Sequence, residues 1–208
     1  MNALRVTHRT TAAIVVIFVV AHISNHLAAL VSLETHIHFM ERLRTVYRLP
    51  VIETALLIGV ALQAASGLRL VYLNWNARTG VIEWLQAASG TYLGLFLLIH
   101  IAAVLIGRVV YGLDTNFHFA AAGLHVRPFQ YFFTAYYFLA VLALFTHLGC
   151  ALSWYVGARI RLRAFVVALS VCIGVTVSTL ILAALTGKIY PYEVHDQYKN
   201  IYRVQQTN

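Results

Sequence analysis

Residues 11–32 read TAAIVVIFVVAHISNHLAALVS, an apolar stretch that contains no Asp, Glu, Lys or Arg. A bilayer core of about 30 Å is spanned by roughly 20 apolar residues at about 1.5 Å of helix rise each. The stretch therefore predicts a transmembrane helix. Two histidines, His22 and His26, lie inside it, and polar side chains at bilayer depth are costly unless they have partners or functions. The same segment thus predicts a site within the membrane.

Four further stretches of this kind make up most of the chain. The 208 residues are 61% hydrophobic and only 11% charged, which excludes a water-soluble globule. We expect an all-α membrane protein, a bundle of five transmembrane helices at about 11–32, 50–73, 85–107, 129–156 and 164–187. The bundle forms one domain, residues 1–187, and a polar, tyrosine-rich tail follows at 188–208. The five helices leave too few residues for a soluble catalytic domain in this chain. Chemistry outside the bilayer therefore needs a partner protein.

The net charge of +8 lies at the ends of the predicted helices and forms no basic stripe of the kind that binds nucleic acid. We use the name side A for the membrane side that carries the N-terminus, and the name side B for the opposite membrane side. Side A carries the three tryptophans, which favour the headgroup level: Trp75, Trp84 and Trp154. Lys and Arg are almost equally divided between the sides. However, the compact cationic loop at 159–163 resists translocation and predicts that side A and the N-terminus are cytoplasmic.

The two cysteines, Cys150 and Cys172, lie in apolar helices without CxxC spacing. They indicate neither a disulfide framework nor a zinc site, and buried cysteine is usually a small hydrophobe. The first apolar run ends without a small-residue cleavage site, so we expect a retained helix rather than a signal peptide.

Four histidines lie deep in the predicted helices: His22, His26, His100 and His147. At about 1.5 Å per residue, His22 and His100 lie roughly 20–25 Å from side A, and His147 roughly 18 Å. Two neutral imidazoles at one level on facing helices suit the two faces of haem. Zinc would require four ligands, and no carboxylate or thiolate accompanies these histidines. The alternative is neutral imidazoles that are hydrogen-bonded to carbonyls or small polar side chains.

Two internal sequence repeats, which we call echoes, indicate which histidines would be ligands. The pattern Phe18-xxx-His22-Ile recurs at 96–101, so it places the same residue on two helices that run in the same direction. The hexapeptide Leu-Gln-Ala-Ala-Ser-Gly at 62–67 recurs at 85–90, but short apolar words also recur by chance. The first echo favours His22 and His100 as a pair. His26, one turn later, would face a haem propionate or a quinone, or would bond to Asn25 or a loop carbonyl.

The other six histidines fall in predicted loops and tails, where solvated or headgroup-facing side chains are expected: His8, His36, His38, His118, His125 and His195.

Several short sequence motifs follow one another along the chain: Phe18–Asn25, His38–Glu41, Glu53, Leu85–Gly90 followed by His100, Asn116-Phe117, and His147 with Ser153-Trp154. In the order and spacing of these motifs the chain resembles the five-helix cytochrome b membrane subunit of succinate dehydrogenase and fumarate reductase, of the single-chain, di-haem-like type. The resemblance implies a haem-binding domain in which helices one and three hold one haem, and helices two and four the other. By position, His22 and His100 would hold the haem nearer side B, and His147 would be one ligand nearer side A.

The chain departs from the family pattern in its second helix. Where the family has histidine four residues before a glycine, this chain has Gln63 before Gly67. Glutamine is a poor iron ligand, so the sequence supports one haem b better than two. The second haem is absent or five-coordinate on His147, and Gln63→His would then supply the missing imidazole.

The resemblance implies a bacterial cell-membrane anchor that passes electrons between membrane quinone and an iron–sulfur subunit, with a flavoprotein, on the cytoplasmic side. The anchor itself would not be catalytic, and the direction of electron flow stays open. Glu53 is the only carboxylate inside a predicted span, so it is the candidate for handling quinone protons, with Gln63 as a further quinone candidate. Alternatively, Glu53 is an ordinary first-turn glutamate after Pro50.

A second function stays open: a stand-alone membrane cytochrome b, or a haem-stabilised scaffold of the same fold without dehydrogenase partners. A transporter with a histidine proton relay is disfavoured, because the helices lack the paired Gly/Pro-interrupted segments that mark midplane sites.

Overall fold

The computed structural model describes residues 2–157 and 159–204, and all regular structure in these residues is helical. Five helices are long and apolar enough to cross a membrane: α1 (Asn2–Ala28), α3 (Pro50–Leu73), α4 (Val81–Val109), α6 (Phe129–Ser153) and α7 (Ile160–Leu185). The prediction of an all-α chain with five apolar helices is confirmed. These helices indicate a multi-pass integral membrane protein.

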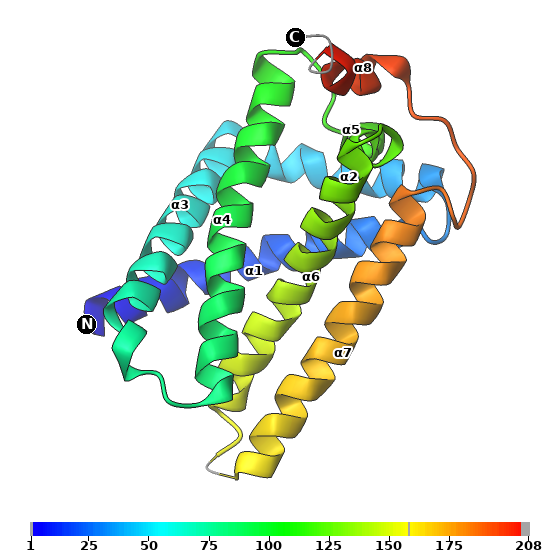
Figure 1. Cartoon of the computed structure of the whole chain (residues 1–208). Helices are drawn as coiled ribbons and strands as arrows, with labels where there is room; N and C mark the ends of the chain where they lie inside the picture. Colours follow the sequence, from blue (N-terminus) through cyan, green and yellow to red (C-terminus); the bar gives the residue numbers. More distant parts are fainter. Residues whose placement is uncertain (1, 158, 205–208) are drawn as a thin grey trace.

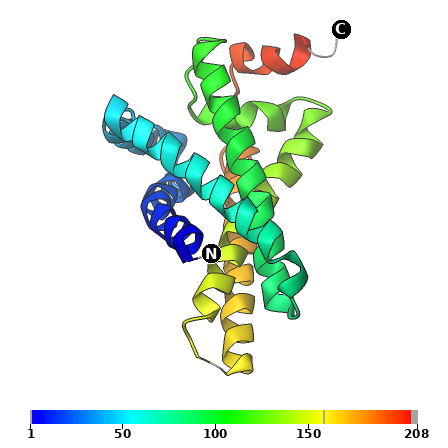
Figure 2. The same cartoon turned by 90° about the vertical axis from the view of Figure 1, so that its left-hand side faces the viewer.

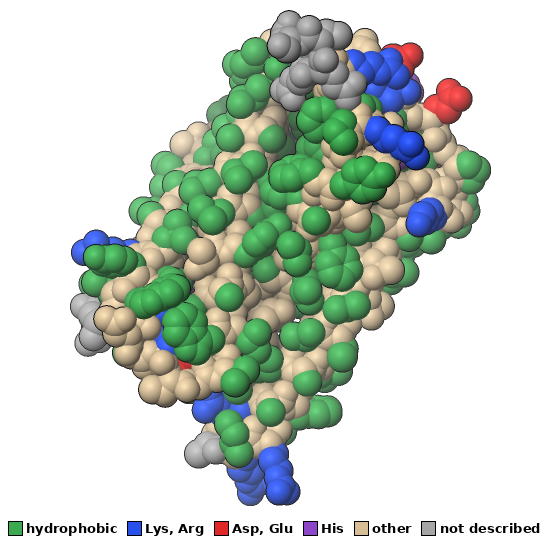
Figure 3. Space-filling model, in the orientation of Figure 1, with side chains coloured by type: hydrophobic (Ala, Val, Ile, Leu, Met, Phe, Trp, Pro, Cys, Tyr) green, Lys and Arg blue, Asp and Glu red, His purple; other side chains and the backbone are tan. Residues whose placement is uncertain are grey.

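Shorter elements join the long helices: α2 (Leu33–Tyr47), the 3₁₀ turns η1 (Trp75–Ala77) and η2 (Gly123–His125), α5 (Phe117–Ala122) and α8 (Asp196–Val204). In Figure 1 the side B elements α2, α5 and α8 lie at the upper end, and the α3–α4 and α6–α7 connections of side A lie at the lower end. Lys and Arg gather toward the ends and edge of the molecule in Figure 3, with a largely apolar surface between them. This distribution suits a protein that lies across a bilayer.

Close contact between α6 and α7 depends on small residues. A Cβ atom on Gly149 would lie 2.4 Å from the Cβ of Ser170, so the two helices meet where a larger residue would not fit. Ser178 donates a hydrogen bond to the Phe138 carbonyl across the same interface (3.1 Å). α4 packs against α6 and α3, and α3 packs against α1. α1 lies across the other long helices rather than alongside them (Figures 1 and 2).

The first connection differs from the prediction. α1 begins at Asn2 rather than near residue 11, and it ends at Ala28 although the apolar run continues to residue 32. The reason is Ser32, whose side chain accepts a hydrogen bond from the Thr35 backbone N–H (3.0 Å) and thereby starts α2. The segment predicted as a loop is thus an amphipathic helix.

The α3–α4 connection is stabilised by Glu83. Its carboxylate accepts hydrogen bonds from the backbone N–H groups of Thr79 (2.9 Å) and Gly80 (2.8 Å), which starts α4 at Val81 rather than near residue 85.

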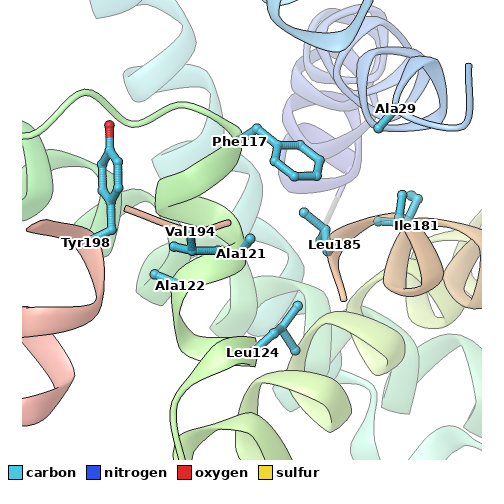
Figure 4. Close-up of a cluster of buried hydrophobic side chains, with 10 residues drawn as sticks. Ala29, Phe117, Ala121, Ala122, Leu124, Ile181, Leu185, Val194 and Tyr198 are labelled. Atoms are coloured by element: carbon cyan, nitrogen blue, oxygen red, sulfur yellow. The ribbon is translucent and has the colours of Figure 1, made fainter. Parts of the chain in front are cut away.

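The tail packs against the bundle. Val194 and Tyr198 are buried against α5, and the Asn116 amide donates a hydrogen bond to the Tyr198 hydroxyl (3.0 Å). Figure 4 shows both residues beside Ala121 and Ala122 of α5. The segment expected as a polar tail is therefore part of a side B cap, as far as the described residues reach.

Candidate intramembrane histidine site

Four imidazoles from three helices form a histidine cluster near side B: His22 and His26 of α1, His36 of α2 and His100 of α4. The ring centroids of His22 and His100 are 6.1 Å apart. Those of His22 and His26 are 4.7 Å apart, and those of His26 and His36 are 5.5 Å apart. The structure thus brings together the two histidines that the sequence echo pairs, with His26 beside them.

A phenylalanine one turn earlier supports each member of the central pair. Phe18 stacks on His22 (centroids 5.7 Å apart, planes at 16°), and Phe96 stacks on His100 (5.2 Å, 13°). The i,i+4 spacing places these rings on one helix face. The repeated Phe-xxx-His pattern therefore corresponds to two equivalent Phe–His stacks on different helices. Each stack limits the rotation of its imidazole.

His36 closes the cluster from α2. Its Nδ1–H donates to the Asn25 carbonyl (2.7 Å), and its Nε2 faces the Asn25 amide nitrogen at 3.5 Å. The side chain is only 2% exposed, so the prediction of a solvated loop residue is wrong. Burial lowers the pKa of His36, which keeps the ring neutral at pH 7.

Two polar atoms in the cluster lack partners. His26 Nδ1 and Asn25 Oδ1 are buried without a hydrogen-bond partner among the described residues. An unsatisfied buried polar group costs about 1–3 kcal/mol, and native proteins rarely leave one without a reason. The arrangement therefore favours a ligand with polar groups that meets His26 at the side B end of the pair.

The donor set suits haem better than a bare metal ion. In the described part of the chain, no group of three or more His, Cys, Asp or Glu side chains is arranged to hold a metal ion. Haem needs only two axial protein ligands. Metal–imidazole bonds of about 2 Å on each side, together with the ring radii, separate the ring centroids by roughly 6 Å. The 6.1 Å between His22 and His100 fits that requirement.

His147 lies apart from this cluster, near side A. Its Nδ1 is 3.1 Å from the Gln86 carbonyl oxygen and 3.4 Å from Ser89 Oγ. Gln63 bonds instead to α1: its amide nitrogen is 3.3 Å from His8 Nε2, and its carbonyl oxygen accepts from the Thr11 hydroxyl (2.5 Å). His8, predicted in a solvated tail, lies within α1 and contacts α3, because α1 starts earlier than its charge pattern indicates.

Glu53 forms an ion pair with Arg108, which joins the first turn of α3 to the last turn of α4. Arg48, which the sequence places near Glu53, instead contacts Thr115 (3.3 Å) and Asp114 (3.9 Å). The carboxylate is therefore compensated by Arg108 rather than by Arg48, its neighbour in sequence. Both partners are about one-quarter exposed, so the protein does not fully enclose the pair.

No protein-family model, no curated protein and no solved structure matches this chain.

Proposed function

We propose that this chain is a haem b-containing membrane anchor that transfers electrons between an iron–sulfur partner and membrane quinone. The observation that carries the proposal is the facing pair of His22 and His100, each backed by a phenylalanine, on two apolar helices. A neutral histidine with a purely structural role needs only one hydrogen-bond partner. It does not need a second imidazole whose ring centroid is 6.1 Å away and which is also stacked on a phenylalanine.

The side chains divide the work of holding the cofactor. His22 and His100 would bind the iron, and Phe18 and Phe96 hold the two rings. His26 would donate or accept a hydrogen bond at the side B edge through its unpaired Nδ1. Bound in this way, haem supplies a one-electron carrier whose potential depends on its axial ligands and apolar surroundings.

Quinone reduction or oxidation also moves protons, which a side chain near the membrane surface must handle. Glu53, paired with Arg108 and about one-quarter exposed in the first turn of α3, is the candidate at side B. Gln63 is the weaker candidate, because both ends of its amide already bond to α1.

Side A offers a cationic, aromatic surface for the partner subunits. Arg78 lies over the rings of Trp75 (5.4 Å) and Trp84 (5.5 Å), and Arg163 lies over Trp154 (3.7 Å). These contacts hold the arginines at the headgroup level. An acidic surface on an iron–sulfur protein is the chemistry that they would attract.

Purification in mild detergent from the native membrane tests the proposal. The anchor requires haem b together with a flavoprotein and an iron–sulfur protein in fixed ratio. Haem b without these partners would favour the stand-alone cytochrome. A chain without haem would contradict both.

A further inference from the structure

Two arginines at the C-terminal end of α2 share one carboxylate at side B. Arg44 and Arg48 are one helical turn apart, so their side chains leave the helix on the same face. Both reach Asp114, in the segment after α4: Oδ1 of this residue lies 2.8 Å from Arg44 Nη2 and 3.9 Å from Arg48 Nη2. Within residues 2–157 and 159–204, no other carboxylate forms an ion pair with either arginine. We name Arg44 and Arg48 the arginine pair, and its two positive charges face a single negative one.

The arginine pair also keeps hydrogen-bond donors without acceptors. Arg44 Nε and Arg48 Nε are buried and bond to no described residue, and Arg44 Nη2 forms its ion pair with Asp114 without forming a hydrogen bond. Arg48 Nη2 donates to the Thr115 hydroxyl (3.3 Å). The other carboxylate oxygen of Asp114 accepts from the Asn116 amide (3.1 Å). Buried donors of a charged group are costly without acceptors, so this arrangement favours a further anion with several oxygens.

A phosphate group has the chemistry that the arginine pair lacks. It is negatively charged, and its oxygens are spaced so that one guanidinium can donate two parallel hydrogen bonds to them. The Arg44 side chain is 13% exposed, whereas the side chains of Arg48 and Asp114 are 31% and 47% exposed. The site is therefore closed toward the helices and open on the side of Asp114, from which a phosphate can approach.

The surroundings of the arginine pair suit a lipid rather than a free anion. The two chain segments that carry the site end or begin membrane-spanning helices, α4 at Val109 and α3 at Pro50. Large apolar side chains on these segments are exposed: Val46, Leu49, Val51, Val109, Val110 and Tyr111. A phosphate at this level would place the acyl chains of its lipid along these side chains, and anionic lipids are attracted to cations at the membrane surface. A free phosphate would gain nothing from them.

We propose that Arg44 and Arg48, together with the Thr115 hydroxyl, bind the phosphate group of an anionic membrane lipid at side B. Asp114 competes with that phosphate for the two guanidinium groups. The site is separate from the electron-transfer function proposed above and does not require haem. A lipid bound here would join α2 to the segment after α4 more firmly than the single carboxylate does.

Native mass spectrometry of the purified, delipidated full chain tests the site. The probes are phosphatidylglycerol, which is anionic, and phosphatidylcholine, whose phosphate is neutralised by its own choline. The wild-type chain should bind phosphatidylglycerol about tenfold more tightly than phosphatidylcholine. Arg44→Gln and Arg48→Gln should each weaken phosphatidylglycerol binding about tenfold, because each removes hydrogen bonds from a charged group. Arg42→Gln, which removes the same charge from an exposed position on α2, should bind like the wild type.

Two further variants separate lipid binding from structural support. Changing Arg44 and Arg48 together to lysine keeps both charges beside Asp114 but removes the Nε–H donors and the planar fork. This variant should stay folded and should still bind phosphatidylglycerol more weakly. Asp114→Asn removes the competing carboxylate and should tighten phosphatidylglycerol binding. An arginine pair that served only the ion pair would give unchanged lipid binding in both variants, which would overturn the proposal.

The remaining outcomes distinguish the source of the anion. Inorganic phosphate that binds as tightly as phosphatidylglycerol would show a site for a free anion and would overturn the lipid assignment. Loss of haem together with lipid in Arg44→Gln and Arg48→Gln would show that the arginines hold a haem carboxylate, which also overturns it. A wild-type chain that lacks haem but binds phosphatidylglycerol through the arginine pair would support this site and contradict only the proposed function.

Discussion

At the scale of single residues, the histidines differ mainly in what holds their rings. His22 and His100 stack on phenylalanines and make no hydrogen bond to a carbonyl that competes for their nitrogens in the described contacts. His36 is bonded through both nitrogens to Asn25. The first two rings are therefore suited to bind a ligand, whereas His36 is suited to orient its surroundings.

His100→Ala should remove the haem near side B. The change leaves His22 without a partner and replaces a filled slot by a cavity, and cavities of comparable size cost on the order of 3 kcal/mol in protein cores. Haem content should fall by one equivalent, and the melting temperature should fall with it. His38→Ala serves as the control, and unchanged haem content in His100→Ala would refute the ligand assignment.

At the scale of elements, the side B ends of the helices are joined by polar contacts and by the cap of α5 and α8. The Glu53–Arg108 pair joins α3 to α4, and Arg44 contacts Asp114 at 2.8 Å to join α2 to the loop after α4. The cap closes this end by burying Val194 and Tyr198. These contacts hold the side B ends of the helices together.

Glu53→Gln should slow quinone turnover while haem content stays constant. Arg108→Gln breaks the same ion pair but keeps the carboxylate, so it separates proton handling from structural support. A partly exposed pair of this kind contributes about 1 kcal/mol or less, so both variants should melt within a few degrees of the wild type. Equal turnover in both variants would support a plain helix-start role for Glu53.

Docking of α8 should weaken as the pH falls. Burial, and then the nearby His195, lower the pKa of His118 from its ordinary value of 6.5. The groups that face His118 are His195 (ring centroids 4.5 Å apart), Tyr192 (6.0 Å) and Tyr198 (6.1 Å). The undocked state binds the proton more readily, so the contribution to docking is complete above pH 6.5 and is lost as the pH falls toward the lowered pKa.

Hydrogen exchange of the α8 amides at about pH 7.5 and about pH 5.5, corrected for intrinsic rates, measures this effect. The protection factor should be lower at acidic pH in the wild type. In His118→Gln it should depend much less on pH. A wild-type protection factor that does not change would contradict the role of His118.

The elements that sequence could predict are those with a simple signal. Apolar length predicts the five long helices, and the Phe–His echo predicts that His22 and His100 share one environment. α2 was missed although Ser32, His36 and Met40 carry a cap and a helical period, because its mean polarity is that of a loop. The place of His8 within α1 was not predicted, because the charged residues near His8 make the start of this helix resemble a polar tail. Long-range contacts such as Gln63 with α1 have no local signature.

At the scale of the whole molecule, charges at the ends and an apolar surface between them define its place in the membrane (Figure 3). The arginines at the start of α7 and the tryptophans mark side A, and the α5–α8 cap marks side B. Under the proposed function, electrons would pass between a partner at side A and the histidine cluster near side B, where Glu53 is about one-quarter exposed.

The orientation can be tested with reporters. We expect a fluorescent reporter on the N-terminus to be cytoplasmic, because the cationic segment 159–163 at the start of α7 favours that side. A periplasmic alkaline phosphatase fused after the tail should be active, because five spans place the termini on opposite sides. An active phosphatase at the N-terminus would reverse the assignment.

The central claim is that His22 and His100 hold haem b, and the reduced-minus-oxidised optical spectrum of the purified chain tests it most directly. We predict an α-band in the b-haem region for the wild type, with its side B component absent from His22→Ala and His100→Ala. A folded, monodisperse wild-type chain with no α-band, also after growth with added haem precursor, would contradict the claim.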